Sequence, residues 1–376
     1  MEMDVLFMNN LMSPVRIVFR VVCLPKLIVF LTVFSSFFST ALFGSSLLSS
    51  SLLGSSVASA AEVRVAALQF GTVNWVLDVI KLRKLDEKYS FKMKVIPLAS
   101  TNGGKIALQG GSAEIVTSDW TWVSRRRAEK ADFALVPYSS AVGHLMVAAN
   151  SDIKTLDDLR GKKIAVAGGP LDKSWLFLRA YAKKKHGFDL ADIATPVYGA
   201  PPLLTQKMIR GEFDAVLNFW HFSARLKAKG FRSLLSVGDV MVELGASGPT
   251  VAIGFTFSEG WANKNKKQLK GFLSAAKEAV AILDKEDDIW NDIRPRMKAE
   301  DEATFLALRR SFRDGVLRRP LIVEQADVQR LYTVLAKLGG TKLLGRSKEL
   351  SPGTFWLLGD ISQPVSLNIR EAEKVN

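Results

Sequence analysis

Short apolar runs alternate with helical segments along the chain between residues 62 and 260. The apolar runs predict strands at residues 63–70, 92–99, 114–117, 134–137, 142–149, 163–167, 194–198, 215–219 and 250–257. The segments between them predict helices at residues 73–85, 103–109, 120–129, 173–185 and 202–209, with a helical turn at 155–159. This alternation is typical of an α/β fold with largely parallel sheets.

The pattern changes after residue 260, where apolar positions recur at helical spacing. They predict four helices at residues 262–283, 287–297, 303–313 and 324–338, the last ending at Gly339-Gly340. The strand runs 142–149 and 250–257 are the two places where the chain could pass between lobes. We therefore expect a first lobe of residues 62–145 and 255–376, and a second lobe of residues 146–254.

The first sixty residues have the layout of a secretory signal peptide. Arg16, Arg20 and Lys26 precede an uncharged run over residues 27–61, and the small residues Ala58 and Ala60 suit cleavage just after them. The run is also long enough for a membrane anchor. Its serine-rich second half favours cleavage, so we expect residues 1–60 to be removed during export.

Composition narrows the classes of protein further. The chain has 376 residues, a net charge of +14, one cysteine and three histidines. Since the cysteine, Cys23, lies in the predicted leader, a disulfide scaffold and a cysteine-ligated metal site are excluded for the exported protein. The basic runs are scattered and form no stripe typical of nucleic-acid binding. Their positive field would instead draw anionic ligands or favour an anionic membrane surface. We expect no metal and no cofactor.

Polar and aromatic residues gather where five predicted strands end. In open α/β sheets, ligands bind beyond the carboxyl ends of the strands. Backbone N–H groups at a helix start suit a carboxylate, sulfonate or phosphate, and aromatic rings supply apolar walls. The alternative for each tryptophan is that it packs on the sheet. The candidate ligand-binding residues are Gln69, Asn74, Trp75, Ser100, Thr101, Ser118, Asp119, Trp120, Gly169, Asp172, Lys173, Ser174, Asn218 and Trp220.

The chain carries no recognisable catalytic motif. Residues 168–170 (Gly-Gly-Pro) lack the lysine and hydroxyl residue of a phosphate-binding loop, and no nucleophile elbow is present. Asp119 and Asp172 could form a carboxylate pair, although two solvated aspartates are the commoner case. His221 is either a ligand donor or an ordinary helix-start residue, and His144 is expected in the core or at a hinge. We expect no catalytic residues.

Three segments together resemble a known family. Residues 106–115, 155–166 and 211–220 resemble the short helix and strand, the turn and strand that open the second lobe, and the late strand of periplasmic solute-binding proteins of ABC importers. The late strand is similar to the nitrate/sulfonate/taurine branch, which includes thiamine-pyrimidine binders. The resemblance implies a type II periplasmic-binding-protein fold, with two α/β lobes joined by two hinge strands. It also implies a soluble monomer in the periplasm that delivers a small organic ligand to an ABC permease and its ATPase.

The strand tips depart from the sulfonate and nitrate pattern in one respect. Gln69 and Asn74 are neutral where an arginine or histidine anion clamp is expected. This favours a larger organic ligand (a sulfonate, an aromatic molecule or a pyrimidine-like molecule) over a compact inorganic anion. Two alternatives stay open. One is a pyrimidine-synthase-like enzyme of the same fold, although its cysteine-rich segment is missing here. The other is a ligand-sensing subunit for a membrane receptor.

Overall fold

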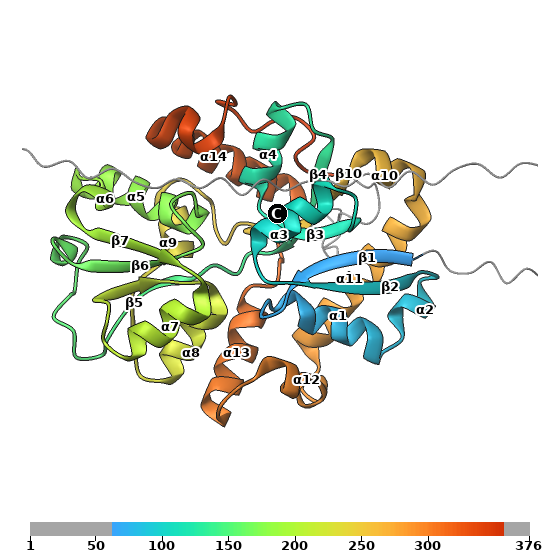
Figure 1. The fold of residues 1–376 in the computed structure, drawn as a ribbon, viewed down its shortest axis with the longest axis horizontal. Helices are drawn as coiled ribbons and strands as arrows, with labels where there is room; N and C mark the ends of the chain where they lie inside the picture. Colours follow the sequence, from blue (N-terminus) through green and yellow to red (C-terminus); the bar gives the residue numbers. More distant parts are fainter. Residues whose placement is uncertain (1–61, 357–376) are drawn as a thin grey trace, which may run out of the picture. The chain divides into compact units, whose positions relative to one another are not determined.

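The computed structural model describes residues 62–356, apart from the side chains of residues 338–343. The predicted leader, residues 1–60, lies outside the described residues. Within them, the chain forms two five-stranded sheets with helices between the strands (Figure 1). The predicted α/β class is therefore confirmed.

The first sheet has the order β2-β1-β3-β10-β4. Its strand β1 pairs in parallel with β2 and β3, whereas β10 is antiparallel to β3 and β4. The strands are β1 (Glu62–Leu68), β2 (Lys92–Leu98), β3 (Ile115–Ser118), β4 (Phe133–Ser139) and β10 (Ile253–Ser258). The helices that connect them are α1 (Val73–Leu82), α2 (Leu85–Lys88), α3 (Thr101–Gln109) and α4 (Trp120–Ala128).

The second sheet repeats this arrangement with the order β7-β6-β8-β5-β9. Its strand β6 is parallel to β7 and β8, and β5 is antiparallel to β8 and β9. The strands are β5 (His144–Val147), β6 (Lys163–Ala167), β7 (Thr195–Gly199), β8 (Ala215–Leu217) and β9 (Arg232–Ser236). The helical elements are η1 (Asp157–Leu159), α5 (Lys173–His186), α6 (Leu190–Ile193), α7 (Pro201–Ile209), α8 (Trp220–Ala228) and α9 (Val237–Glu243). The chain crosses between the sheets twice, before β5 and after α9.

Five helices follow β10 and contact the helices of both sheets. They are α10 (Glu259–Lys264), α11 (Lys266–Lys285), α12 (Ile289–Met297), α13 (Glu302–Asp314) and α14 (Leu321–Leu344). Helices α11 and α12 pack on α1, α13 packs on α8, and α14 contacts both α4 and α5. The C-terminal helices therefore connect the part of the chain around the first sheet with the part around the second.

The structure differs from the predicted elements in several places. The short helices α2 and α6 were not predicted, and the helix predicted at residues 262–283 is divided into α10 and α11. The structure adds α8, β9 and α9 between residues 220 and 243, where all five residues of β9 are only half-buried and the apolar pattern is weak. Helix α14 also continues through Gly339-Gly340 to Leu344, so the predicted end at these glycines is wrong. Glycine costs a helix only about 1 kcal/mol relative to alanine. Burial of Val328, Leu331 and Leu335 on α14 offsets such a cost.

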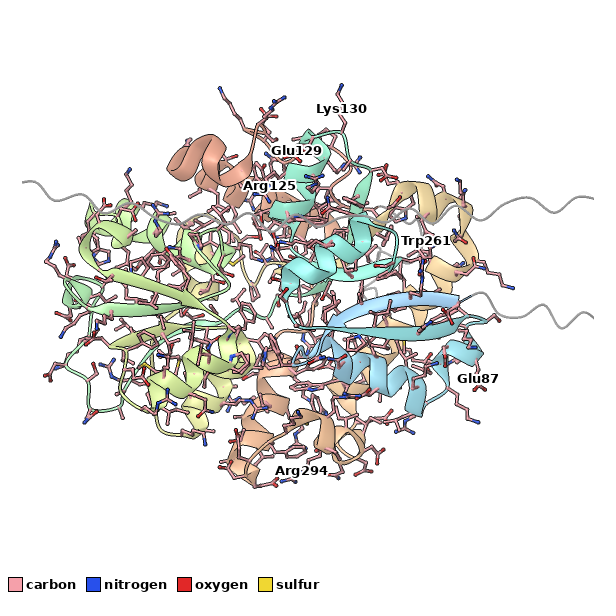
Figure 2. The ribbon with its side chains drawn as sticks, in the orientation of Figure 1. Glu87, Arg125, Glu129, Lys130, Trp261 and Arg294 are labelled. Carbon is pink, nitrogen blue, oxygen red and sulfur yellow. The ribbon has the colours of Figure 1, made fainter. Side chains whose placement is uncertain are left out.

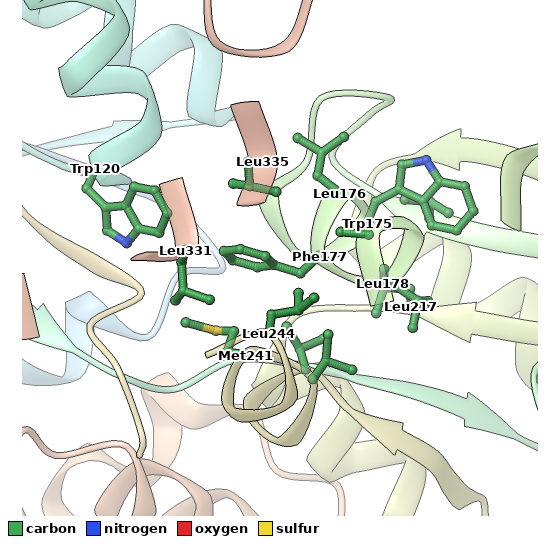
Figure 3. Packing of buried hydrophobic residues seen from close by; sticks show 14 of the residues in the cluster. Trp120, Trp175, Leu176, Phe177, Leu178, Leu217, Met241, Leu244, Leu331 and Leu335 are labelled. Carbon is green, nitrogen blue, oxygen red and sulfur yellow. The ribbon is translucent and has the colours of Figure 1, made fainter. Parts of the chain in front are cut away.

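An apolar junction joins α4, α5 and α14. The rings of Trp120 on α4 and Phe177 on α5 lie 6.2 Å apart, and Tyr332 on α14 lies 6.3 Å from Trp120. All three side chains are fully buried. Figure 3 shows Trp120, Phe177 and Leu331 approaching one another from the three helices. Because each ring comes from a different element, their burial holds these helices against one another.

A second contact fixes the return crossing, which we call the linker (residues 245–252). The Glu324 carboxylate on α14 accepts from the backbone N–H of Val251 at 2.6 Å. The Asp327 carboxylate accepts from the backbone N–H of Ser247 at 2.9 Å and from the Thr250 hydroxyl at 3.4 Å. One face of α14 therefore satisfies the backbone N–H groups of Ser247 and Val251, whereas the Ala252 N–H donates to the Ser139 carbonyl of β4 at 2.8 Å.

Two arginines complete this contact, and we call Glu324, Asp327, Arg319 and Arg330 together the clamp. Arg319 and Arg330 both form ion pairs with the fully buried Asp327 carboxylate. Arg319 also donates to the Pro249 carbonyl at 2.7 Å, and Arg330 donates to the Gly245 carbonyl at 2.9 Å. Burial by itself would raise the pKa of Asp327, but its hydrogen bonds from Arg319, Ser247 and Arg330 hold that pKa below its ordinary value.

The apolar junction predicts that Phe177→Ala is severely destabilising. Truncation of a buried phenylalanine leaves a cavity, and we expect the free energy of unfolding to fall by about 3–5 kcal/mol. Urea denaturation followed by circular dichroism measures this loss. The control is Leu82→Ala, because Leu82 is 54% exposed; we expect it to change stability by less than about 0.5 kcal/mol. Equal losses in the two variants would contradict the assigned role of Phe177.

The clamp predicts a pH-dependent effect of Asp327→Asn. Because the folded-state pKa of Asp327 is lowered, its carboxylate stabilises the fold above the ordinary aspartate pKa of about 4, and this contribution is lost as the pH falls below it. Burial raises the pKa of Glu324 and repulsion from Asp327 adds to it, so the substitution also relieves a part of this opposite effect. We expect the variant to lose about 3 kcal/mol at pH 7 and clearly less at pH 3. Denaturation at both pH values checks this, and a loss independent of pH would refute it.

Candidate functional site

Each sheet carries one aspartate between the end of a parallel strand and the start of the next helix. Asp119 follows β3 and caps α4 by accepting from the backbone N–H of Trp122 at 2.9 Å. Asp172 follows β6 after a short loop and caps α5 by accepting from Ser174 N at 2.9 Å and Trp175 N at 3.2 Å. A carboxylate at this position satisfies N–H groups that the helix itself cannot bond. Local capping therefore fixes both carboxylates at strand ends.

Two lysines accompany these aspartates. The Lys105 ammonium on α3 lies 3.7 Å from the Asp119 carboxylate and 5.4 Å from the Trp122 ring. The Lys173 ammonium, at the start of α5, donates to the Ala252 carbonyl and lies 5.6 Å from the Trp120 ring. Lys173 belongs to a helix of the second sheet, yet these two partners belong to the linker and to α4. We call Lys105, Asp119, Asp172 and Lys173 the interlobe cluster.

The charges of the interlobe cluster shift one another's pKa values. Burial would raise the pKa of Asp119, but Lys105, Lys173 and hydrogen bonds from Thr121 and Trp122 lower it to about 2. Burial raises the pKa of Asp172 to about 6, with repulsion from Asp119 adding to the effect. Burial also lowers the pKa of Lys173, against the attraction of both aspartates. The cluster thus has a firmly ionised Asp119 and an Asp172 that gains a proton in mildly acidic solution.

The two candidate asparagines support turns. Asn74 is buried and donates to the carbonyls of Leu68 at 2.7 Å and Gly71 at 2.8 Å. Asn218 is buried and donates to Pro201 O at 3.1 Å and to the Thr205 hydroxyl at 2.9 Å. Each amide N–H₂ group is therefore engaged in holding the chain where a strand meets a helix.

The candidate tryptophans pack against other side chains of the protein, which is the alternative to ligand binding that the sequence left open for each of them. Trp75 and Trp220 meet edge to face at 5.7 Å, and Phe312 lies 6.0 Å from Trp75 and 6.4 Å from Trp220. Trp75 is 4% exposed and Trp120 is fully buried, with its indole N–H donating to the Val251 carbonyl at 2.9 Å. Trp220 is half-buried. These rings form walls inside the protein, and a role against a ligand stays a prediction for them.

The remaining candidates lie at the strand tips and differ in their exposure and in their hydrogen bonds. Gln69 and Thr101 are exposed, while Ser100 caps α3 by accepting from Gly103 N at 3.1 Å. Gly169 has a φ of +148°, which other residues rarely adopt. Ser174 is half-buried. The hydroxyl of Ser118 is buried and finds no hydrogen-bond partner among the described residues.

Sequence reasoning did not identify Lys105 or Trp122 as site residues. Both lie within helices, at positions that look like ordinary helical surface and core in the sequence. The basic run at residues 125–127 lies at the opposite end of α4 from Asp119, where Figure 2 labels Arg125, Glu129 and Lys130. There Arg127 pairs with Glu259 at 2.9 Å. This run therefore belongs to the surface near the end of α4.

Residues 62–356 contain no cluster of three or more histidine, cysteine, aspartate or glutamate side chains that could hold a metal ion. Over the same part of the chain, none of the helices combines the length and the apolar character needed to span a bilayer.

The raised pKa of Asp172 predicts a stability change on Asp172→Asn. Because the folded protein disfavours the carboxylate, Asp172 costs stability as the pH rises from about 4 through about 6. Asparagine caps a helix as well as aspartate does. We therefore expect the variant to be more stable by about 1–2 kcal/mol at pH 8 and unchanged at pH 4. Thermal denaturation at both pH values measures this, and a destabilised variant at pH 8 would show that the negative charge is required there.

Known proteins resemble this chain in sequence and in fold. Residues 126–286 match the family model described as NMT1/THI5 like. No curated protein sequence matches the chain. The structure is similar to the alkanesulfonate-binding protein SsuA from Xanthomonas axonopodis pv. citri bound to MOPS, with a TM-score of 0.61 and 19% identity over 78% of this chain and 98% of that one.

Two further solved structures extend the comparison. The periplasmic aliphatic sulphonate binding protein SsuA from Escherichia coli has a TM-score of 0.60 and 20% identity, and the match covers 79% of this chain and 92% of that one. The periplasmic nitrate-binding protein NrtA from Synechocystis PCC 6803 has a TM-score of 0.52 and 13% identity, covering 66% and 69%. The chain therefore has the two-lobed fold of the periplasmic sulfonate- and nitrate-binding proteins, and its residues 126–286 match the NMT1/THI5-like family.

Proposed function

We propose that this protein is the solute-binding component of an ABC importer, which closes around a small organic ligand and delivers it to a permease. Its lobes would be residues 62–145 with 255–376, and residues 146–254. The observation that carries the proposal is the interlobe cluster, in which Lys173 of the second lobe bonds the linker and, after Lys105, helps to lower the pKa of Asp119 of the first lobe. Groups from both lobes that meet at strand tips are what a ligand needs to favour the closed form.

The proposed ligand contacts are the groups at the strand tips that the protein leaves accessible or without partners. Lys105 is partly exposed and lies over Trp122, and Ser118 has a free buried hydroxyl. Ser174 and Gly169 add a hydroxyl and an uncrowded backbone. Such a set, with few polar groups and apolar walls, suits an organic ligand such as a sulfonate, an aromatic acid or a pyrimidine.

The proposal includes export and binding without chemistry. Residues 1–60 would be cleaved as a signal peptide and the mature protein would act in the periplasm. Structural neighbours whose printed names describe periplasmic binding proteins support this location. The alternatives are an enzyme of the same fold and a subunit that reports its ligand to a membrane receptor.

A ligand screen on the mature protein tests the proposal. Alkanesulfonates, aromatic acids and pyrimidines are added separately, and a true ligand at a hundredfold excess over its Kd stabilises the protein by about 2.7 kcal/mol. Lys105→Met and Asp119→Asn should each weaken binding of the hit by about tenfold, because each removes a charge-assisted contact or its support. Binding is measured by calorimetry.

Lys264→Met serves as the control because Lys264 is an exposed lysine of α10, remote in sequence from the strand tips. We expect it to bind the hit as the unaltered protein does. If no compound in the screen stabilises the protein, the solute-binding function is contradicted. If a hit binds but ignores both cluster substitutions, only the proposed site is wrong. Conversion of the hit to a new product would establish the enzyme instead.

A further inference from the structure

A pocket of about 480 Å³ lies between α8 and α13, apart from the strand tips. Helix α8 belongs to the second sheet, whereas α13 is one of the helices that follow β10. The polar lining consists of Lys227 from α8 and of Arg310, Ser311 and Asp314 from α13. Its volume lies within the range of small-molecule sites, roughly 300–1,000 Å³.

The Lys227 ammonium is held by a histidine rather than by a carboxylate. Its Nζ lies 3.3 Å from His144 Nε2, and His144 Nδ1 lies 2.9 Å from the Ser233 hydroxyl. An ammonium group can only donate, so Nε2 accepts and the ring proton sits on Nδ1. Burial and the neighbouring Lys227 lower the pKa of His144 to about 4, so the ring is neutral at physiological pH. The contact therefore orients Lys227 without cancelling its charge.

Arg310 contributes a second cation with no ion-pair partner among residues 62–356. Its neighbours on α13 differ, because Arg309 and Arg313 both pair with Asp287, at 3.4 and 2.7 Å. Asp314 lines the same pocket but forms no ion pair within 4.0 Å in the described part of the chain. Burial lowers the pKa of Lys227, Asp314 raises it, Arg310 lowers it and Asp239 raises it, so these charges act on one another around the pocket. The two cations and one anion of the lining itself leave it positive, and Asp239 outside the lining offsets a part of that charge.

The rest of the lining is apolar. Ala224 on α8 and Leu306 on α13 line the pocket, and Leu306 is 43% exposed. A positive end with a hydroxyl donor and an apolar flank complements an anion carried on a short carbon skeleton. Inorganic phosphate would use only the polar part of such a lining, so an organic anion should bind more tightly.

We propose that the α8–α13 pocket is a second binding site, distinct from the interlobe cluster, for a small organic monophosphate or similar dianion. Lys227 and Arg310 bind the anionic group, Ser311 donates a hydrogen bond, and Leu306 contacts the carbon skeleton. Because the two cations come from α8 and α13, the anion bridges helices that belong to different parts of the fold. Its occupancy would favour the arrangement of lobes in which these helices are in contact.

Calorimetric titration of the mature protein with phenyl phosphate at low ionic strength tests this site, with inorganic phosphate as the weaker probe. We expect Lys227→Met and Arg310→Met each to weaken phenyl phosphate binding by about tenfold. Asp314→Asn should tighten it, because the substitution removes a negative charge from the lining. Lys229→Met, on the same helix end but outside the lining, should leave it unchanged.

The remaining outcomes overturn the proposal. Absence of binding in the unaltered protein excludes the site. Equal weakening by Lys229→Met shows that only the general positive field attracts phosphate. Loss of binding in Lys105→Met, with binding retained in Arg310→Met, places the anion at the interlobe cluster. If Lys227→Met fails to fold by circular dichroism, the exposed positions Arg310 and Asp314 still decide, since their substitutions are expected to act in opposite directions.

Discussion

The buried carboxylate of Asp327 is the constraint on which the rest of the arrangement depends. It lies in α14, accepts hydrogen bonds from the linker and is neutralised by Arg319 and Arg330. A buried charge without such partners would cost several kcal/mol. The Asp327 carboxylate can therefore be buried only where the two arginines and the linker donors are also in place. The clamp therefore fixes where the chain returns from the second sheet to the first.

The linker that Asp327 holds also shapes the candidate site. Its last two residues, Val251 and Ala252, offer carbonyls to Trp120 and Lys173, which come from helices of different sheets. A shift of the linker would therefore move the acceptors of both side chains at once. In this way the C-terminal helix α14, which contributes no residue to the interlobe cluster, positions one member of it, Lys173, and the neighbouring Trp120 ring.

Local features of the fold and site could be predicted from the sequence, and long-range ones could not. Asp119 and Asp172 stand between an apolar run and a helix start, and helix capping depends only on such neighbours. The weak apolar pattern of β9 concealed an edge strand. Lys105 carries no local signal, because its place beside Asp119 depends on how α3 packs near β3. The same limit applies to Trp75, whose tip position did not reveal that its ring turns toward Trp220 and Trp290.

The distribution of charge at the strand tips constrains what a ligand can do there. Helices α4 and α5 begin with N–H groups that would suit an anion, but the protein's own carboxylates, Asp119 and Asp172, already accept from them. A small anion placed at either helix start would face a negative charge and would need to displace a cap. Lys105 and Lys173 offset this repulsion only with the part of their positive charge that Asp119 does not already balance. Under the proposed function, recognition at this site would therefore depend on lysines, hydroxyls and apolar surface, which favours an organic molecule with a separated polar group.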